Sequence, residues 1–110
     1  MNPRHCIKVD DFSQNELIDL FELTAELKHK YRTKEDFKPF RNHSMAMIFA
    51  KPSARTRVSF ETGFSWMGGH AIYLAPQDIG LGKRESASDL AQLFSRYNDL
   101  IMARVYSLSL

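Results

Sequence analysis

Residues 45–69 decide the fold of this chain and read MAMIFAKPSARTRVSFETGFSWMGG. The segment opens with five consecutive apolar residues, Met45 to Phe49, a continuity typical of a strand that is buried on both faces. Lys51-Pro52 ends this strand, and residues 56–67 have the apolar content of a helix that Gly68-Gly69 terminates. A buried strand followed at once by a helix predicts the βα unit of a parallel sheet.

The rest of the chain continues the alternation of helices and strands. A capping box, Ser13-Gln14-Asn15-Glu16, precedes apolar residues that recur at the spacing of one helix face. Strands that alternate with helices imply right-handed crossovers and a parallel sheet. We therefore predict an α/β fold with three αβα layers. Its further elements are a helix over residues 14–31, a surface connection over 33–43, a strand over 71–74, a glycine-containing loop over 76–84, a helix over 86–97 and a strand over 100–103.

The segment Ser53 to Arg57 places two guanidiniums where the second helix starts. The first backbone N–H groups of a helix lack intrahelical acceptors and carry the positive end of its dipole, and the arginine fork matches phosphate oxygens. Ligand sites of parallel sheets lie beyond the carboxyl ends of the strands, where residues 51–56, residues 77–84 and Arg104 follow. We therefore expect a site for a small oxyanion at this edge of the sheet.

Each of these arginines also has an ordinary structural interpretation. Arg57 lies four residues before Glu61 and can pair with that carboxylate on the helix surface. Arg55 and Arg104 can equally be solvated charges at the ends of regular elements. The stretch Gly80 to Lys83 does not form a nucleotide-binding P-loop, because the required earlier glycine and following serine or threonine are missing. We expect the aromatic residues of the helix to lie in the core: Phe60, Phe64 and Trp66.

Composition excludes several functional classes. The chain has 110 residues, 44% of them hydrophobic, a net charge of +2, and no apolar segment near the ~20 residues that cross a bilayer. We therefore expect neither nucleic-acid nor membrane binding. The single cysteine, Cys6, and four scattered histidines indicate no disulfide, metal site or catalytic triad. Residues 1–11 lack a signal-peptide or presequence pattern, so we expect a cytoplasmic protein, or an organelle-matrix protein whose presequence was removed.

Residues Phe49 to Gly63 resemble the aspartate and ornithine carbamoyltransferase family, which carries Ser-Thr-Arg-Thr-Arg followed by Ser-Phe-Glu. Val105-Tyr106 stands where the aspartate enzyme usually has His-Pro, and Glu61 to Phe64 also favours the ornithine branch. Aspartate, acetylornithine, succinylornithine and putrescine remain alternative amines, since the family selects the amine mainly through a second domain. The resemblance continues through Gly68-Gly69, residues 78–82, Glu85-Ser86, Asp89 and residues 101–104.

The resemblance implies an incomplete carbamoyl-phosphate-binding domain over residues 1–110, without the amine-binding domain. In the full enzyme, carbamoyl transfer to the side-chain amine of ornithine gives citrulline and phosphate, as in arginine biosynthesis and the urea cycle, without a cofactor. Ser53, Ala54, Arg55 and Thr56 would bind the phosphate, Arg104 would approach the carbamoyl oxygen, and Arg55 and Arg104 would act in catalysis. Ala54 replaces a frequent threonine, so we expect weakened phosphate binding.

The family also implies a homotrimer in which a loop of the neighbouring subunit completes each site. Gly80 occupies the place where ornithine enzymes often present glutamine or histidine, and Lys83 or Arg84 would supply the contact instead. Ornithine would bind through the missing domain, because family members are much longer than this chain. The missing length suggests a truncated product or an incomplete gene model, and we expect negligible turnover by this chain alone. The alternative is a non-catalytic module for anion binding or subunit interaction.

Overall fold

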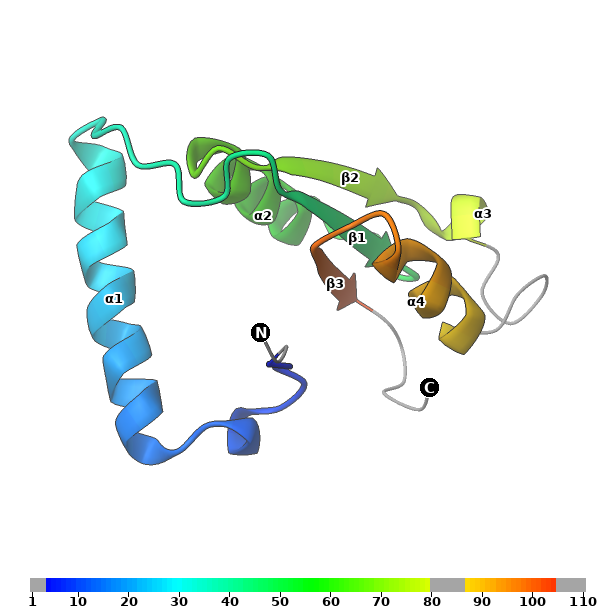
Figure 1. Cartoon of the computed structure of the whole chain (residues 1–110), viewed down its shortest axis with the longest axis horizontal. Helices are drawn as coiled ribbons and strands as arrows, with labels where there is room; N and C mark the ends of the chain where they lie inside the picture. Colours follow the sequence, from blue (N-terminus) through cyan, green and yellow to red (C-terminus); the bar gives the residue numbers. More distant parts are fainter. Residues whose placement is uncertain (1–3, 80–86, 105–110) are drawn as a thin grey trace. The chain divides into compact units, whose positions relative to one another are not determined.

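The computed structural model describes residues 4–79 and 87–104 of the chain (Figure 1). The chain divides into two compact units, Met1–Asp36 and Phe37–Leu110. The first unit contains a short 3-10 helix, η1 (Val9–Asp11), and one long helix, α1 (Gln14–Arg32). The second unit contains the strands and the remaining helices.

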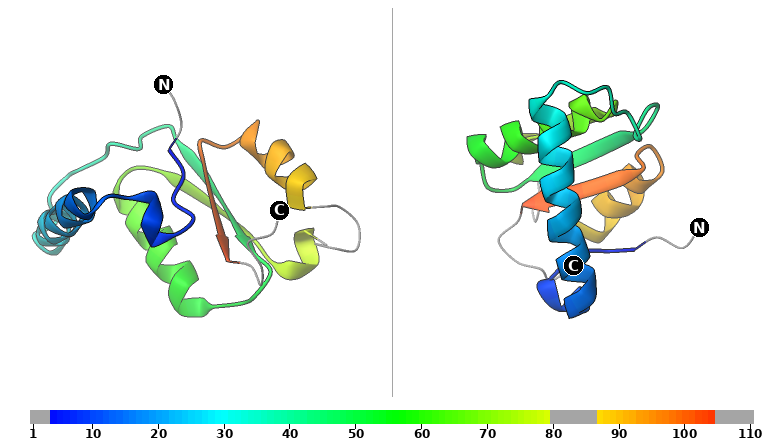
Figure 2. Two further views of the ribbon diagram at one scale, coloured as in Figure 1. Left: turned by 90° about the horizontal axis from the view of Figure 1, so that it is seen from below. Right: turned by 90° about the vertical axis from the view of Figure 1, so that its left-hand side faces the viewer.

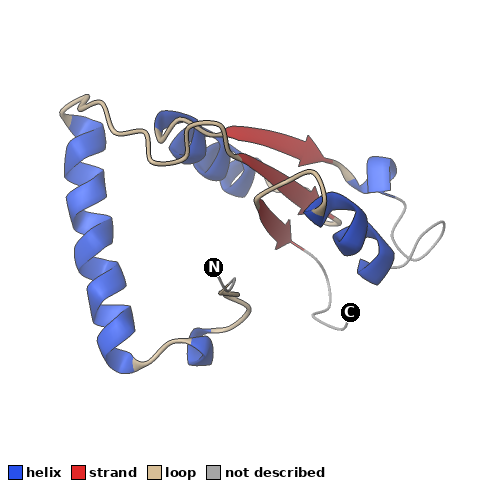
Figure 3. Cartoon of the chain, in the orientation of Figure 1, coloured by secondary structure: helices blue, strands red, loops and turns tan. Residues whose placement is uncertain are grey.

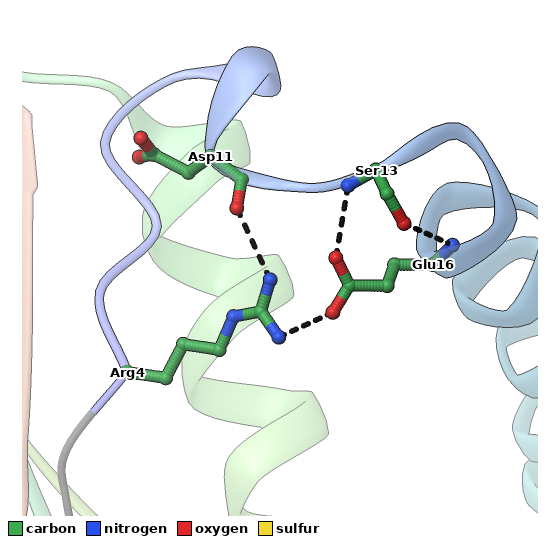
Figure 4. Close-up of polar contacts among 4 residues, drawn as sticks. All are labelled: Arg4, Asp11, Ser13 and Glu16. Carbon is green, nitrogen blue, oxygen red and sulfur yellow. Dashed lines mark hydrogen bonds and ion pairs between the residues drawn. The ribbon is translucent and has the colours of Figure 1, made fainter.

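Helix α1 begins at the predicted capping box. The Ser13 backbone N–H donates to Glu16 Oε1 at 2.9 Å, and the Glu16 N–H donates to Ser13 Oγ at 3.2 Å. Figure 4 shows that Arg4 joins this cap by pairing with Glu16 Oε2 and by donating to the Asp11 carbonyl oxygen at 3.1 Å. The hydrogen bond from Arg4 is the main reason that the pKa of Glu16 falls to about 2. Reciprocal bonds thus satisfy N–H groups that a helix start otherwise leaves without acceptors.

The apolar residues predicted for one face of α1 lie on a regular helix. No residue of α1 is buried, although its length agrees with the prediction to within one residue. The hydroxyl of Thr24 donates to the carbonyl of Leu20 at 2.7 Å, as is common for threonine within a helix. The large apolar side chains of α1 that are exposed are Ile18, Leu20, Phe21, Leu23 and Tyr31.

The second unit contains a parallel sheet of three strands: β1 (Ser44–Phe49), β2 (His70–Leu74) and β3 (Leu100–Arg104). Their order is β2-β1-β3, so the first strand lies at the centre (Figure 3). In the register of the sheet, Met47 pairs with Tyr73 on β2 and Met102 on β3. The predicted strands are therefore confirmed, each longer by one residue at one end.

Helices cover both faces of this sheet, as Figure 2 shows for α2 (Ala54–Trp66) and α4 (Ala87–Ser95). Alternate residues of β1 face opposite layers. Met45, Met47 and Phe49 pack with Phe64 of α2, while Ile48 packs with Leu90 of α4. Burial of both faces explains the uninterrupted apolar sequence of β1 and confirms the predicted three-layer αβα fold.

The end of α2 shows why two glycines stand there. Gly68 has a φ of 90°, and its N–H donates to the carbonyl of Ser65 at 2.9 Å. Gly69 donates to the Phe64 carbonyl at 2.9 Å, and a Cβ at Gly69 would overlap the Phe64 ring. One glycine thus adopts a left-handed conformation, and the other allows the chain to pass the buried ring.

Two predictions about local structure are wrong. Residues predicted as the start of a loop form a one-turn helix, α3 (Pro76–Ile79), in which Asp78 Oδ2 accepts the Ala75 N–H at 2.9 Å. Proline at the first helical position favours this turn. Phe60 is 44% exposed, because the part of α2 that covers the sheet is the side bearing Phe64.

Candidate anion-binding site

The first turn of α2 is organised by Ser53, which precedes the helix in an extended conformation. Ser53 Oγ accepts the Thr56 N–H at 3.4 Å and donates to Thr56 Oγ1 at 3.0 Å. The Ser53 carbonyl accepts the N–H of Arg57 at 3.0 Å. The N–H groups of Ala54 and Arg55 belong to the same turn, in which the helix itself supplies no acceptors. This helix start therefore presents backbone donors together with two hydroxyls.

Arg104 ends β3 beside this turn. Its Nη1 donates to Thr56 Oγ1 at 3.4 Å, and its carbonyl accepts the Ala50 N–H at 3.0 Å. Its Nε is buried and has no hydrogen-bond partner among the described residues. A buried cationic donor without an acceptor is costly, and such groups concentrate at functional sites. The guanidinium and the helix start thus form one cluster of donors.

The sheet register explains how these distant residues meet. Arg104 pairs with Phe49 across the two parallel strands, and Phe49 faces the layer of α2. Paired residues of neighbouring strands point to the same face, so Arg104 also faces α2. The start of this helix follows the carboxyl end of β1 after four connecting residues. The expectation that these segments share one edge of the sheet is therefore confirmed for Ser53, Thr56 and Arg104.

Arg55 is exposed and makes no hydrogen bond or ion pair within residues 4–79 and 87–104. Arg55 directly precedes Thr56 in the first turn of α2, but its guanidinium makes no interaction with Arg104. The side chain of Ala54 is also exposed. The structure therefore places these two residues in the turn that follows Ser53, with both side chains exposed.

The side chain of Arg57 makes the structural contact that the sequence offered as an alternative to anion binding, the pair with Glu61. Its Nε donates to Glu61 Oε1 at 2.7 Å, and its guanidinium carbon lies 3.8 Å from the centre of the Tyr73 ring. The pairing with Glu61 follows from helical spacing and was expected as one possibility. Tyr73 was missed by sequence reasoning, because its position beside α2 depends on the register of β2.

The other expected site residues, Gly80, Lys83 and Arg84, lie outside the described part of the chain, as do Val105 and Tyr106, which favoured the ornithine branch. Within the described residues, no group of three or more histidine, cysteine or acidic side chains is placed to bind a metal ion. In the same residues, no helix has both the length and the apolar character needed to cross a bilayer. Cys6 is exposed and carries a free thiol.

Comparisons with known proteins agree with this geometry. Residues 4–109 match the family described as aspartate/ornithine carbamoyltransferase, carbamoyl-P binding domain. The chloroplastic ornithine carbamoyltransferase of Pisum sativum is 54% identical over 102 residues, which are 92% of this chain and 27% of that protein.

Solved structures give the same result. The ornithine carbamoyltransferase of Burkholderia thailandensis has a TM-score of 0.87 at 41% identity, with 93% of this chain and 35% of that chain covered. The enzyme of Pyrococcus furiosus has a TM-score of 0.89 at 39% identity, with coverage of 94% and 33%. This chain belongs to the aspartate/ornithine carbamoyltransferase family, a family of transferases, and matches its carbamoyl-phosphate-binding domain. It spans about a third of the length of these relatives.

Proposed function

We propose that this chain supplies the carbamoyl-phosphate site of an ornithine carbamoyltransferase, which converts ornithine and carbamoyl phosphate into citrulline and phosphate. One observation carries the proposal: a half-buried Arg104, whose buried Nε has no partner among the described residues, beside the Ser53–Thr56 turn of α2. The names of the relatives support ornithine as the amine substrate. Aspartate or another amine is the alternative within the family.

In this proposal the phosphate binds at the start of α2. Backbone N–H groups of Ala54 and Arg55, the hydroxyls of Ser53 and Thr56, and the Arg55 fork donate to its oxygens. The exposure of Arg55 suits this role, because a planar guanidinium that has no acidic partner among the described residues is available to the dianion. Ala54 contributes its N–H without a hydroxyl, which reduces the number of donors by one.

Arg104 acts on the carbamoyl group. The amine nitrogen attacks the carbamoyl carbon to form the new C–N bond, and negative charge develops on the carbamoyl oxygen. A fixed cationic donor near this oxygen stabilises that charge more strongly in the transition state than in the ground state. The C–O bond to phosphate then breaks, phosphate leaves with the electron pair, and the amine releases its proton. Positioning and electrostatics therefore suffice, without a protein nucleophile.

The full reaction needs parts beyond the described residues. We propose that ornithine binds a second domain of the longer protein, and that the active form is a homotrimer. By sequence, Gly80 corresponds to the loop that reaches a neighbouring subunit's site in the family, and we propose that Lys83 or Arg84 provides that contact. We place the reaction in the cytoplasm or in an organelle matrix, the latter supported by the chloroplastic relative. A non-catalytic module for anion binding or subunit interaction is the second candidate, in which the donors of Ser53, Thr56 and Arg104 would bind an anion without a following reaction.

The test is a calorimetric titration of the chain with carbamoyl phosphate. Charge-assisted hydrogen bonds contribute about 1.5–3 kcal/mol each, so Arg55→Ala should weaken binding by about tenfold or more. Arg96→Ala is the matched control, because Arg96 is an exposed arginine that follows α4. Equal affinities of the wild-type chain and Arg55→Ala would contradict the assignment of the site.

A further inference from the structure

Arg57 lies next to the anion site but is held by other groups. Its guanidinium stacks over the Tyr73 ring with 3.8 Å between the guanidinium carbon and the ring centre. Its Nε donates to Glu61 Oε1 at 2.7 Å, one helical turn further along α2. The face and one edge of the guanidinium are thus engaged at the same time. Only a planar cation can make both contacts, and lysine cannot replace it.

The Tyr73 ring is a fixed platform for this contact. Tyr73 belongs to β2 and pairs with Met47 of the central strand. Its ring lies against Phe49, with 5.2 Å between ring centres and a tilt of 54°. Because Phe49 is fully buried, the sheet and its core determine where the ring lies. A cation stacked on Tyr73 is therefore tied to the sheet rather than to a mobile side chain.

The first turn of α2 consequently has a tether to each outer strand. Thr56 is bonded to Arg104 on β3, and Arg57 is stacked on Tyr73 of β2. The strand order β2-β1-β3 places these contacts on the two sides of the central strand. The helix start is reached from β1 by residues 50–53, which form neither helix nor strand. These two contacts, rather than the connecting residues 50–53, determine where the first turn of α2 lies over the sheet.

We infer that Arg57 is a positioning residue that holds the first turn of α2 over β2, so that Ser53, Thr56 and Arg104 converge on one anion. The inference rests on the proposed function for its ligand, but it assigns to Arg57 no contact with that ligand. Loss of the stack lets the turn move relative to Arg104, and the anion then loses part of its donor set. Arg57 and Tyr73 therefore act as a pair.

The position of the turn can be measured without any ligand. The amide at position 57 is bonded to the Ser53 carbonyl, whereas the Met67 amide is bonded to Gly63 at the other end of α2. Loss of a cation–π contact of this kind should change the equilibrium constant for opening of the helix turn by about fivefold. Amide hydrogen exchange by NMR should therefore be about fivefold faster at position 57 in Tyr73→Leu and Arg57→Lys, with Met67 unchanged. Tyr73→Phe keeps the ring and should match the wild type.

Binding gives the second readout. In calorimetric titrations with carbamoyl phosphate, Arg57→Lys and Tyr73→Leu should each weaken affinity by about fivefold, and the double variant by no more than either one. Arg96→Lys, the same substitution at a distant exposed arginine, should leave affinity unchanged. If Arg57→Lys weakens binding while Tyr73→Leu does not, Arg57 contacts the anion directly and the inference is overturned.

Two further outcomes separate this inference from the proposed function. Exchange that accelerates equally at position 57 and at Met67 would mean general loosening of α2, and would overturn the positioning role. A wild-type chain that binds no carbamoyl phosphate would count against the proposed function, while the exchange pattern would still decide whether Arg57 positions the turn.

Discussion

Replacing Arg104 with methionine should stabilise the free protein while abolishing anion binding. Within residues 4–79 and 87–104, the buried Arg104 Nε has no acceptor, and the hydrogen bond from Nη1 to Thr56 is long, at 3.4 Å. Methionine keeps an unbranched apolar stem like that of arginine but removes the buried Nε donor and the rest of the guanidinium. The carbonyl of residue 104, which accepts the Ala50 N–H, is unaffected by the change.

The magnitude follows from these contacts. A buried donor without a partner costs about 1–3 kcal/mol, and a bond near the distance limit returns about 0.5 kcal/mol. Partial exposure of the rest of the Arg104 side chain relieves part of this cost. The substitution Arg104→Met should therefore raise the free energy of unfolding by about 1 kcal/mol. For a domain of this size, the melting temperature should rise by about 4–8 °C.

Urea unfolding followed by the fluorescence of Trp66 measures this change, since Trp66 lies on α2 in the same compact unit. Arg96→Met is the matched control at an exposed arginine and should stay within about 0.5 kcal/mol of the wild type. Carbamoyl phosphate should give no heat of binding with Arg104→Met. Destabilisation of Arg104→Met beyond that of the control would refute the argument, because the guanidinium would then be a structural group already satisfied in the free protein.

Other predictions concern the α2 terminus and the α1 cap. Gly69→Ala should destabilise the second unit by about 1–3 kcal/mol in urea unfolding, since the added Cβ overlaps Phe64; an unchanged midpoint would show that the ring moves freely. The pKa of Glu16 lies near 2, below its ordinary 4.5, so its contribution to α1 is complete above about pH 5 and is lost as pH falls toward about 2. Circular dichroism should show helix loss over that range, and Glu16→Gln should flatten the curve; an identical curve would exclude the pair with Arg4.

Much of the fold was predictable because its signals are local. The capping box of α1 is a set of hydrogen bonds between residues three apart, and the structure contains both of them. The apolar run of β1 required two covering layers, which α2 and α4 provide. The two errors have different causes: the turn of α3 depends on one local carboxylate bond by Asp78, whereas the exposure of Phe60 depends on which side of α2 meets the sheet.

The features of the site also divide into those that local sequence determines and those that depend on tertiary structure. The sequence by itself indicated that a helix starts within residues 53–57, with arginines beside that start, because caps and dipoles act within one turn. Tertiary structure alone decided which arginines meet that start. Arg104 reaches Thr56 from 48 residues away only because β3 pairs with β1 in one register, and Arg57 reaches Tyr73 only because β2 lies on the other side. Strand order and register depend on packing between distant segments, which local sequence patterns do not encode.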